Sequence, residues 1–420
     1  MNTKNKKIGV IGLGYVGLPL AINFGKVKNF EVYGFDIDEK KIRNLESCNS
    51  YINHINSNDI RKFIKKNKVF SNFKKISEVD FILLCLPTPL KNGNKPDLSY
   101  IVDTINKIFP YLKKDQAISL ESSTYPGTTE EVIIKKLKKK FKIGKNFSVI
   151  YSPEREDPGN KIKMEMIPKV ISGFTAKCSI VAQYYYSKVF KKVILANNLK
   201  TAEFSKILEN VFRSINIGLV NEVKIIADKM GIDVFDIIKT ASSKPFGFMP
   251  FYPGPGVGGH CIPLDPFYLT WKAKKFGVKT KFIELAHQVN TDMKNWIINK
   301  IKIEMKKISK KKILVIGVAY KKDIDDCRES PSLEIISGLK KNNVKVDYHD
   351  PYVSELPLTR KFNLKLKSIP INSKNLKNYD AVLILTDHSK INYRLIKKFS
   401  KKIFDSRGVY LPVDRKIIRV

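Results

Sequence analysis

The stretch KIGVIGLGYVGLPLA, residues 7–21, decides the fold of the first part of the chain. It begins with a short apolar, β-branched run typical of a buried strand, and its end has the pattern of a helix. Three glycines lie between them with the spacing GxGxxG. Gly12 permits a tight turn, Gly14 lets the backbone approach a pyrophosphate, and Gly17 lets the helix pack closely on the strand. Because a helix start also favours phosphate, the stretch predicts a dinucleotide-binding turn rather than a turn that binds nothing.

An acidic residue follows at the expected distance. Asp36 ends the next apolar run, where a carboxylate can bind both ribose hydroxyls and would repel a 2′-phosphate. Arg43, the nearest arginine, lies further along the following helix, so the expected cofactor is NAD rather than NADP. Thr88 follows the third apolar run and is placed to contact the cofactor. The expected cofactor contacts are Gly12, Gly14, Tyr15, Val16, Gly17, Asp36, Thr88 and Thr124.

Short apolar runs alternate with helical patterns, which indicates βαβ units and a parallel sheet with helices on both faces. The runs lie at residues 7–11, 31–35, 81–86, 117–120 and 147–151, and again at 313–318, 344–348, 381–385 and 402–404. A long helical pattern at 199–230 separates the two series. We therefore expect an α/β protein with two Rossmann-like, doubly wound domains, joined by a long central helix and a helical dimerisation segment. The expected domains are 1–196, 197–304 and 305–420.

The loop FYPGPGVGGHCIPLD, residues 251–265, places a cysteine after four glycines and two prolines. Such a loop can wrap a ligand closely and direct backbone N–H groups at it. Cys261 as a small buried apolar residue is the alternative, but structural cysteines more often lie in apolar strands and helices. A thiolate beside a nicotinamide ring has a clear use, because a thiohemiacetal can give up a second hydride and become a thioester that water hydrolyses.

Polar side chains on the long helix and in two loops complete the candidate site. Lys206, Asn210 and Arg213 share one helix face by their spacing, and a cation there would stabilise oxyanions. An ordinary solvated helix face is the alternative. Thr124 and Glu154 lie in loops that follow strands, where doubly wound sheets bind ligands, and they are candidates for positioning or activating water.

Composition excludes several classes of function. The chain has 77 lysines and arginines against 40 acids, a net charge of +37, but only ten of the 77 are arginine and the lysines are scattered. This pattern favours a solvated basic surface over a nucleic-acid-binding module. Five widely spaced cysteines fit a reducing compartment, with no disulfide framework and no metal site. With no signal peptide and no apolar run long enough to cross a bilayer, we expect a cytoplasmic protein without membrane partners.

The order and spacing of these motifs resemble the UDP-glucose/GDP-mannose dehydrogenase family over nearly the whole chain. Residues 152–160 and 251–256 resemble the bacterial UDP-N-acetylglucosamine 6-dehydrogenase branch, and residues 320–323, 328–332 and 404–407 match the family's nucleotide-binding end. The resemblance implies Cys261 as nucleophile, Lys206 as oxyanion-stabilising cation, Asp265 as orienting acid, Asn210 as a substrate or intermediate contact, and Thr124 and Glu154 as hydrolysis residues. The substrate contacts that it implies are Glu154, Arg155, Lys206, Asn210, Arg213, Phe251, Tyr252, Gly258, Lys321, Arg328 and Arg407.

One departure concerns the acid that activates water. UDP-glucose dehydrogenases usually carry a second acid four residues after the position of Glu154, where this chain has Pro158, so Glu156 and Asp157 become candidates. The role of His260, beside the cysteine, stays open, with a plain loop residue favoured over a chemical one.

The resemblance implies a homodimer or higher oligomer that oxidises C6 of UDP-N-acetylglucosamine to the uronate with two NAD, for surface polysaccharides. UDP-N-acetylgalactosamine, UDP-N-acetylmannosamine and UDP-glucose are the alternative substrates. A two-electron hydroxyacid dehydrogenase would make one NADH per turnover and would have no use for Cys261. A nucleic-acid-binding protein on a Rossmann scaffold would instead show salt-dependent binding and no NAD turnover.

Overall fold

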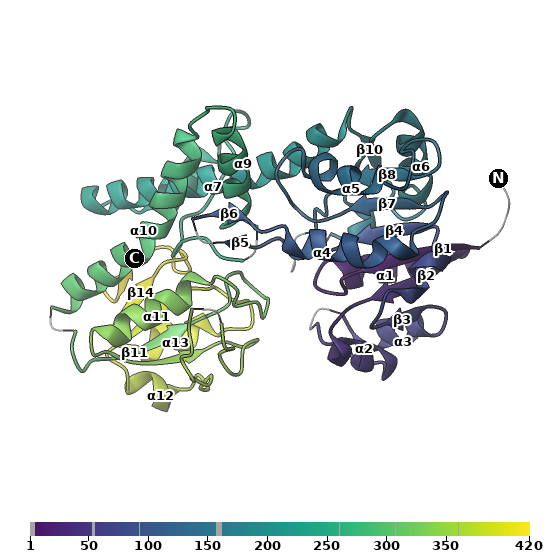
Figure 1. Ribbon diagram of the computed structural model, residues 1–420. Helices are drawn as coiled ribbons and strands as arrows, with labels where there is room; N and C mark the ends of the chain where they lie inside the picture. Colours follow the sequence, from purple (N-terminus) through teal and green to yellow (C-terminus); the bar gives the residue numbers. More distant parts are fainter. Residues whose placement is uncertain are drawn as a thin grey trace. The chain divides into compact units, whose positions relative to one another are not determined.

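The chain folds into two compact units (Figure 1). The computed structural model describes residues 5–52, 55–91, 93–156, 162–259, 261–306, 308–359 and 361–420. Unit 1 comprises residues 1–209 and 267–278, and unit 2 comprises residues 210–266 and 279–420. The long helix α7 (Leu199–Met230) begins in unit 1 and continues in unit 2. Its bounds confirm the helix predicted at 199–230, whereas the three expected domain ranges stay a prediction.

Unit 1 is built on an eight-stranded sheet with the order β10-β9-β8-β7-β4-β1-β2-β3. Its strands are β1 (Lys6–Ile11), β2 (Phe30–Phe35), β3 (Lys68–Phe70), β4 (Phe81–Leu84), β7 (Ala117–Leu120), β8 (Ser148–Tyr151), β9 (Lys169–Gly173) and β10 (Val193–Leu195), and β5 (Leu90–Lys91) pairs separately with β6 (Lys95–Pro96). The five predicted strands are confirmed. The expectation of parallel pairing throughout is wrong at one place, because β9 runs antiparallel to β8.

Helices cover both faces of this sheet, which is why its strands are continuously apolar. Alternate residues of β4 show the cause: Phe81 and Leu83 pack with the helices of one face, and Ile82 and Leu84 with those of the other. The helices of unit 1 are α1 (Gly17–Gly25), α2 (Glu39–Glu46), α3 (Ser57–Ile64), α4 (Ser99–Ile108), α5 (Lys135–Leu137), α6 (Ala176–Tyr186) and part of α9 (Asp265–Lys274), with short helical turns at Lys74–Glu78, Phe109–Tyr111, Thr129–Ile134 and Met164–Met166.

Unit 2 contains a second, all-parallel sheet with the order β12-β11-β13-β14-β15. Its strands are β11 (Lys312–Ile316), β12 (Lys345–His349), β13 (Ala381–Ile384), β14 (Ile403–Asp405) and β15 (Ile417–Arg419), and its helices besides α7 are α8 (Val234–Ala241), α10 (Lys281–Met305), α11 (Pro331–Lys341), α12 (Ser373–Lys377) and α13 (Tyr393–Phe399). Side chains of α10 and α11 pack on one face of the sheet, and those of α12 and α13 on the other. The second doubly wound domain is therefore confirmed.

Helix α7 buries polar side chains and exposes apolar ones. Lys206 and Asn210 are only 8% and 2% exposed, so the alternative of a solvated polar face is wrong for them. Arg213, which their spacing placed on the same face, is exposed. The exposed apolar residues of the helix are Phe204, Leu208, Phe212, Leu219, Ile226 and Met230, which we call the α7 stripe.

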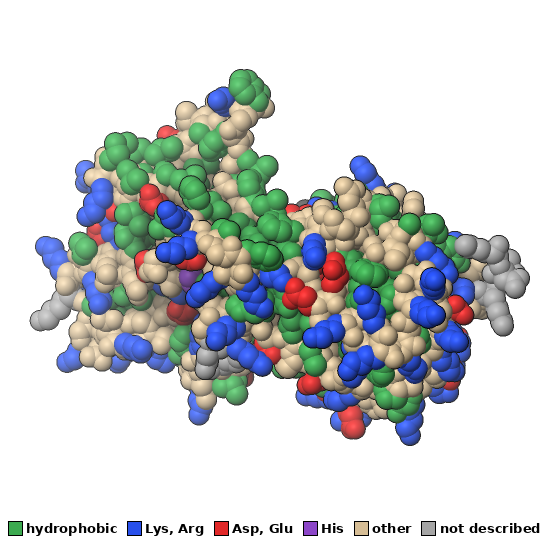
Figure 2. All heavy atoms as spheres, turned by 45° about the horizontal axis from the view of Figure 1, so that its top comes forward, with side chains coloured by type: hydrophobic (Ala, Val, Ile, Leu, Met, Phe, Trp, Pro, Cys, Tyr) green, Lys and Arg blue, Asp and Glu red, His purple; other side chains and the backbone are tan. Residues whose placement is uncertain are grey.

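Two properties of the whole chain bear on its partners. Figure 2 shows Lys and Arg side chains spread over the face in view rather than gathered in one patch. Within the described residues, no helix is both long and apolar enough to span a bilayer.

Candidate active site

The glycine turn lies between β1 and α1, where its glycines are sterically required. Gly12 has a φ of 91°, and a Cβ there would collide with the carbonyl oxygen of Cys85. A Cβ on Gly17 would collide with the carbonyl oxygen of Gly12, so α1 can approach β1 only through a glycine. At Gly14, by contrast, a Cβ would meet nothing within 4 Å. The turn therefore leaves open space at the position where a pyrophosphate is expected.

Asp36 is tied to this turn. Its Oδ2 accepts hydrogen bonds from the backbone N–H of Leu13 at 2.9 Å and from Lys41 Nζ at 3.1 Å, and its Oδ1 accepts one from the N–H of Asp38 at 3.0 Å. Because Leu13 belongs to the turn, these bonds fix the carboxylate beside it. An NAD molecule fits these three features together: the open space at Gly14, the start of α1, and the fixed acid at the end of β2.

The other expected cofactor residues differ in exposure. Tyr15 is half-buried, Val16 is exposed, and Thr88 is buried. Thr124 is fully buried, and its Oγ1 has no hydrogen-bond partner among the described residues. An unpaired buried hydroxyl is costly, so this atom is suited to bind a group that the chain itself does not supply.

Glu154 lies in a network of buried charges at the carboxyl ends of β7 and β8. Lys169 Nζ donates to Glu154 Oε2 and to Glu121 Oε2, each at 2.9 Å, and Glu154 Oε1 accepts the N–H groups of Arg155 and Glu156 at 2.7 and 2.8 Å. Burial acts to raise the pKa of Glu154, but the Lys169 ammonium and the two N–H groups outweigh it and hold that pKa below its ordinary value. Glu154 is thus an ionised acceptor suited to orienting a water. Asp157 and Pro158 lie outside the described residues.

Glu203, in the first turns of α7, anchors the loop that carries Thr124. Its carboxylate accepts the N–H of Gly127, and its Oε1 accepts the N–H and Oγ1 of Thr129 at 2.8 and 2.7 Å. Burial raises the pKa of Glu203 to about 7, against the opposing effect of these donors. Arg155 makes a second link to α7, because its Nη2 lies 2.7 Å from Glu209 Oε1. Two contacts within unit 1 therefore hold the loops after β7 and β8 against the turns of α7 that carry Lys206.

In unit 2, Cys261 lies one turn before α9. Its carbonyl oxygen accepts the N–H of Asp265 at 2.8 Å, and its side chain is exposed. The buried carboxylate of Asp265 accepts a hydrogen bond at 2.6 Å from Asn210 Nδ2, which comes from α7. The structure therefore brings together Cys261, Asp265 and Asn210, three of the residues expected at the site. His260 lies outside the described residues.

The glycine-rich loop before Cys261 packs on residues expected to bind the nucleotide. A Cβ on Gly254 would lie 2.5 Å from Arg407 Nη1, and a Cβ on Gly258 would lie 2.6 Å from Cβ of Tyr320. The N–H of Gly259 donates to the carbonyl oxygen of Arg328 at 2.9 Å. Loop residues therefore lie against Arg328 and Arg407 within unit 2.

The remaining expected substrate residues vary in their surroundings. Phe251 contacts Phe212 of α7 edge-on, with ring centroids 5.7 Å apart. Tyr252 is exposed, and Lys321 is half-buried.

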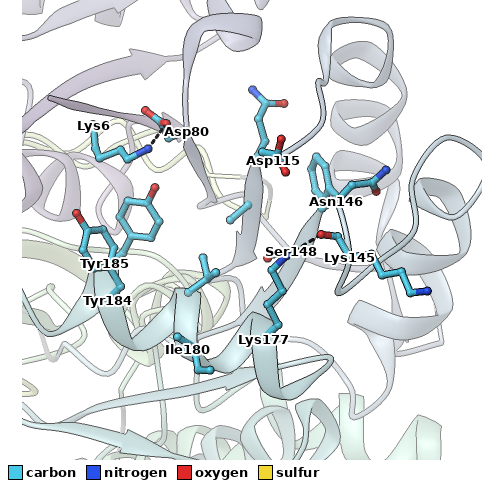
Figure 3. A pocket seen from close by; sticks show the side chains of 14 residues that line it. Lys6, Asp80, Asp115, Lys145, Asn146, Ser148, Lys177, Ile180, Tyr184 and Tyr185 are labelled. Carbon is cyan, nitrogen blue, oxygen red and sulfur yellow. Dashed lines mark hydrogen bonds and ion pairs between the residues drawn. The ribbon is translucent and has the colours of Figure 1, made fainter. Parts of the chain in front are cut away.

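A cavity of about 460 Å³ in unit 1 lies at the amino ends of the strands, whereas the glycine turn lies at their carboxyl ends (Figure 3). It is lined by residues at the amino ends of β1, β7 and β8 and by one side of α6, among them Lys6, Ser148, Lys177 and Tyr185. Ligands of doubly wound sheets bind at the carboxyl ends of the strands, so this cavity is separate from the cofactor site.

Comparison with known proteins decides the family. Residues 6–193, 200–292 and 314–412 match the NAD binding domain, the central domain and the UDP binding domain of the UDP-glucose/GDP-mannose dehydrogenase family. The chain belongs to this family. It is an NAD-dependent nucleotide-sugar dehydrogenase, which confirms the expected fold, cofactor and class of enzyme.

Relatives within the dehydrogenase family differ in the sugar that they are named for. A UDP-N-acetyl-D-glucosamine 6-dehydrogenase of Salmonella typhi is 32% identical over 428 residues, covering 99% of this chain and 98% of the relative. A UDP-N-acetyl-D-mannosamine dehydrogenase of Methanococcus vannielii is 34% identical over 410 residues, covering 96% of this chain and 90% of the relative. The solved structure of a UDP-D-ManNAc dehydrogenase from Pyrococcus horikoshii is 30% identical with a TM-score of 0.86, covering 98% of each chain.

Three polar residues of this dehydrogenase were missed by the sequence analysis: Glu121, Lys169 and Glu203. Each is nearly or fully buried and has a partner between 15 and 76 residues away in the sequence. Glu121 follows directly on a buried strand, which is a usable signal. Lys169 gave none, because its partners depend on the antiparallel course of β9.

Proposed function

We propose that this chain oxidises C6 of a UDP-N-acetylhexosamine, with UDP-N-acetylglucosamine as the favoured substrate, to the carboxylate through a thioester on Cys261. The observation that carries the proposal is the contact of Asp265 with Asn210, which joins the turn after Cys261 to helix α7. A nucleophilic cysteine in a glycine-rich loop, fixed to a helix with a buried lysine, is what a four-electron oxidation needs and a two-electron oxidation does not.

The first half of the reaction makes the aldehyde and then the thioester. NAD supplies the acceptor for a hydride in each of two steps. The Cys261 thiolate adds to the C6 aldehyde, forming a C–S bond, and the Lys206 ammonium stabilises the resulting oxyanion. Loss of the second hydride from C6 leaves the thioester.

Water completes the reaction by breaking the C–S bond and regenerating the thiol. Thr124, whose buried Oγ1 lacks a partner among the described residues, and Glu154, whose carboxylate is ionised, are the groups that hold this water. In total, R–CH₂OH, two NAD⁺ and one water become R–COO⁻, two NADH and three H⁺.

A second candidate substrate is UDP-N-acetyl-D-mannosamine. It is favoured by relatives of that name at 34% identity, alongside the glucosamine relatives at 32%. The two sugars differ only in configuration at C2, so pocket shape decides between them.

The test is the yield of NADH from a limiting amount of each UDP-sugar. Wild type is expected to give two NADH per UDP-N-acetylglucosamine, and Cys261→Ser to lose turnover. One NADH per sugar with an active Cys261→Ser would overturn the thioester mechanism. Two NADH from UDP-N-acetylmannosamine alone would keep the mechanism and replace the substrate.

We also infer a homodimer formed through the α7 stripe. Phe204, Leu208 and Phe212 follow one another at intervals of four, and the stripe continues at Leu219 and Ile226, so all lie on one side of a helix 32 residues long. A continuous apolar row of this length on a helix surface fits a second copy of the same helix.

A further inference from the structure

We propose that Lys169 is a positioning residue for Glu154 in thioester hydrolysis, held in place by Glu121 and Tyr186. The inference rests on the proposed function. The topology of unit 1 explains how Lys169 reaches the site. Because β9 pairs antiparallel with β8, in the register Tyr151 to Ser172, the first residue of β9 lies opposite the position three residues beyond the end of β8. That position is Glu154.

Among the described residues, two carboxylates and two aromatic rings surround the Lys169 ammonium. Two carboxylates accept from it at 2.9 Å, those of Glu121 and Glu154, and its Nζ lies 5.7 Å from the ring centroid of Tyr186 and 5.3 Å from that of Phe190. The Tyr186 hydroxyl also donates to Glu121 Oε1, which accepts from Ser119 Oγ at 2.9 Å as well. Lys169 therefore has no freedom to turn away from Glu154.

Buried charges such as those of Lys169 and its two carboxylate partners are a poor means of stabilising a fold. Lys169 is 2% exposed and Glu121 1% exposed, and buried ion pairs are often no more stabilising than apolar side chains of the same volume. Two carboxylates also share one ammonium, which leaves a net negative charge away from water. Burial raises the pKa of Glu121, whereas Lys169 and two backbone N–H groups hold the pKa of Glu154 below its ordinary value, so the ionised form is favoured more strongly at Glu154 than at Glu121.

The network also selects where Glu154 can bind water. An ionised carboxylate has about four acceptor sites. The N–H groups of Arg155 and Glu156 use both sites of Oε1, and Lys169 uses one of Oε2, so among the described residues one site on Oε2 is left. Lys169 holds that oxygen and thereby sets the direction of the remaining site. Lys169 would therefore set the position of a water bound at this site without contacting the water itself.

The test separates hydrolysis from the two hydride steps. Rapid mixing of Lys169→Met with NAD and UDP-sugar is expected to give a burst of two NADH per active site, followed by turnover slowed roughly tenfold to a hundredfold. The acyl-enzyme on Cys261 should then be visible by intact mass and released by hydroxylamine. Lys169→Arg, which keeps a cation, should restore part of the rate. Lys6→Met is the matched control, because it breaks the Lys6–Asp80 pair at the amino ends of the strands, away from Glu154 (Figure 3).

The pH profile gives a readout with opposite signs in two variants. Without Lys169 the pKa of Glu154 rises, so the acidic limb of kcat should move to higher pH. Glu121→Gln removes the competing carboxylate, leaves Lys169 to Glu154 alone, and should move that limb to lower pH. Because Glu121→Gln removes a buried charge, we expect this variant to fold. Its pH profile therefore tests the inference even if Lys169→Met does not fold.

Folded variants with wild-type turnover and unshifted limbs would overturn the inference. So would equal slowing of the burst and of the steady state with no acyl-enzyme. Failure of the proposed function itself looks different, because wild type would then give one NADH per sugar.

Discussion

Asp36 is the residue that sets the choice of cofactor. Its carboxylate is bonded to Leu13 of the turn and to Lys41, a cation that would suit a 2′-phosphate if the acid were gone. Asp36→Ala should raise KM for NAD roughly tenfold to a hundredfold, since a hydrogen bond to a charged group contributes about 1.5–3 kcal/mol. KM for NADP should rise less or fall. Glu39→Ala, an exposed acid nearby, is the control, and an unchanged ratio of the two KM values in Asp36→Ala would contradict this role.

Glu203 makes the stability of unit 1 depend on pH. An unfolded glutamate titrates near 4.5, whereas burial raises the pKa of Glu203 to about 7 in the folded chain. The folded state thus binds the proton more tightly, and the contribution of Glu203 to stability falls as pH rises from about 4.5 to about 7, by roughly 3 kcal/mol in all. The Tm of Glu203→Gln minus that of wild type should therefore increase between pH 5 and pH 7.5. A difference in Tm that does not change with pH would argue against this role of Glu203.

At the scale of elements, the sequence predicted what local patterns determine. The glycine turn, helix α7 to its last residue, and nine strands follow from spacing and periodicity. The antiparallel course of β9 does not, because nothing within Lys169–Gly173 records the direction of its neighbour. Nor does the burial of Lys206 and Asn210, because a polar helix face is buried only when partners elsewhere in the chain receive it. The pairing of Lys169 with Glu154 was hidden because it depends on the antiparallel course of β9.

The start of α1 permits a test in which two glycines should behave in opposite ways. In Gly17→Ala the new Cβ collides with backbone of Gly12, which cannot move without shifting β1, so Tm should fall by the equivalent of about 3 kcal/mol or more. In Gly14→Ala the Cβ meets nothing within 4 Å of protein, so Tm without cofactor should be unchanged. It occupies the space expected for the pyrophosphate, however, and the stabilisation of this variant by NAD should be lost. Thermal denaturation with and without NAD measures both, and a Gly14→Ala protein stabilised by NAD like wild type would place the pyrophosphate elsewhere.

For the whole molecule, the α7 stripe is the feature that a single chain leaves unexplained. The same helix buries Glu203, Asn210 and Lys224 while exposing a row of leucine, phenylalanine and isoleucine side chains, the reverse of a helix on a monomer surface. In a dimer with a twofold axis, the stripe of one copy would pack against the stripe of the other. Leu219→Glu, 57% exposed at mid-stripe, should shift the mass in solution from dimer to monomer, measured by light scattering during size-exclusion chromatography. Leu358→Glu makes the same change at a leucine that is 78% exposed outside α7 and should leave the mass at that of a dimer. A Leu219→Glu protein that keeps the wild-type mass at micromolar concentration would show that copies meet through another surface.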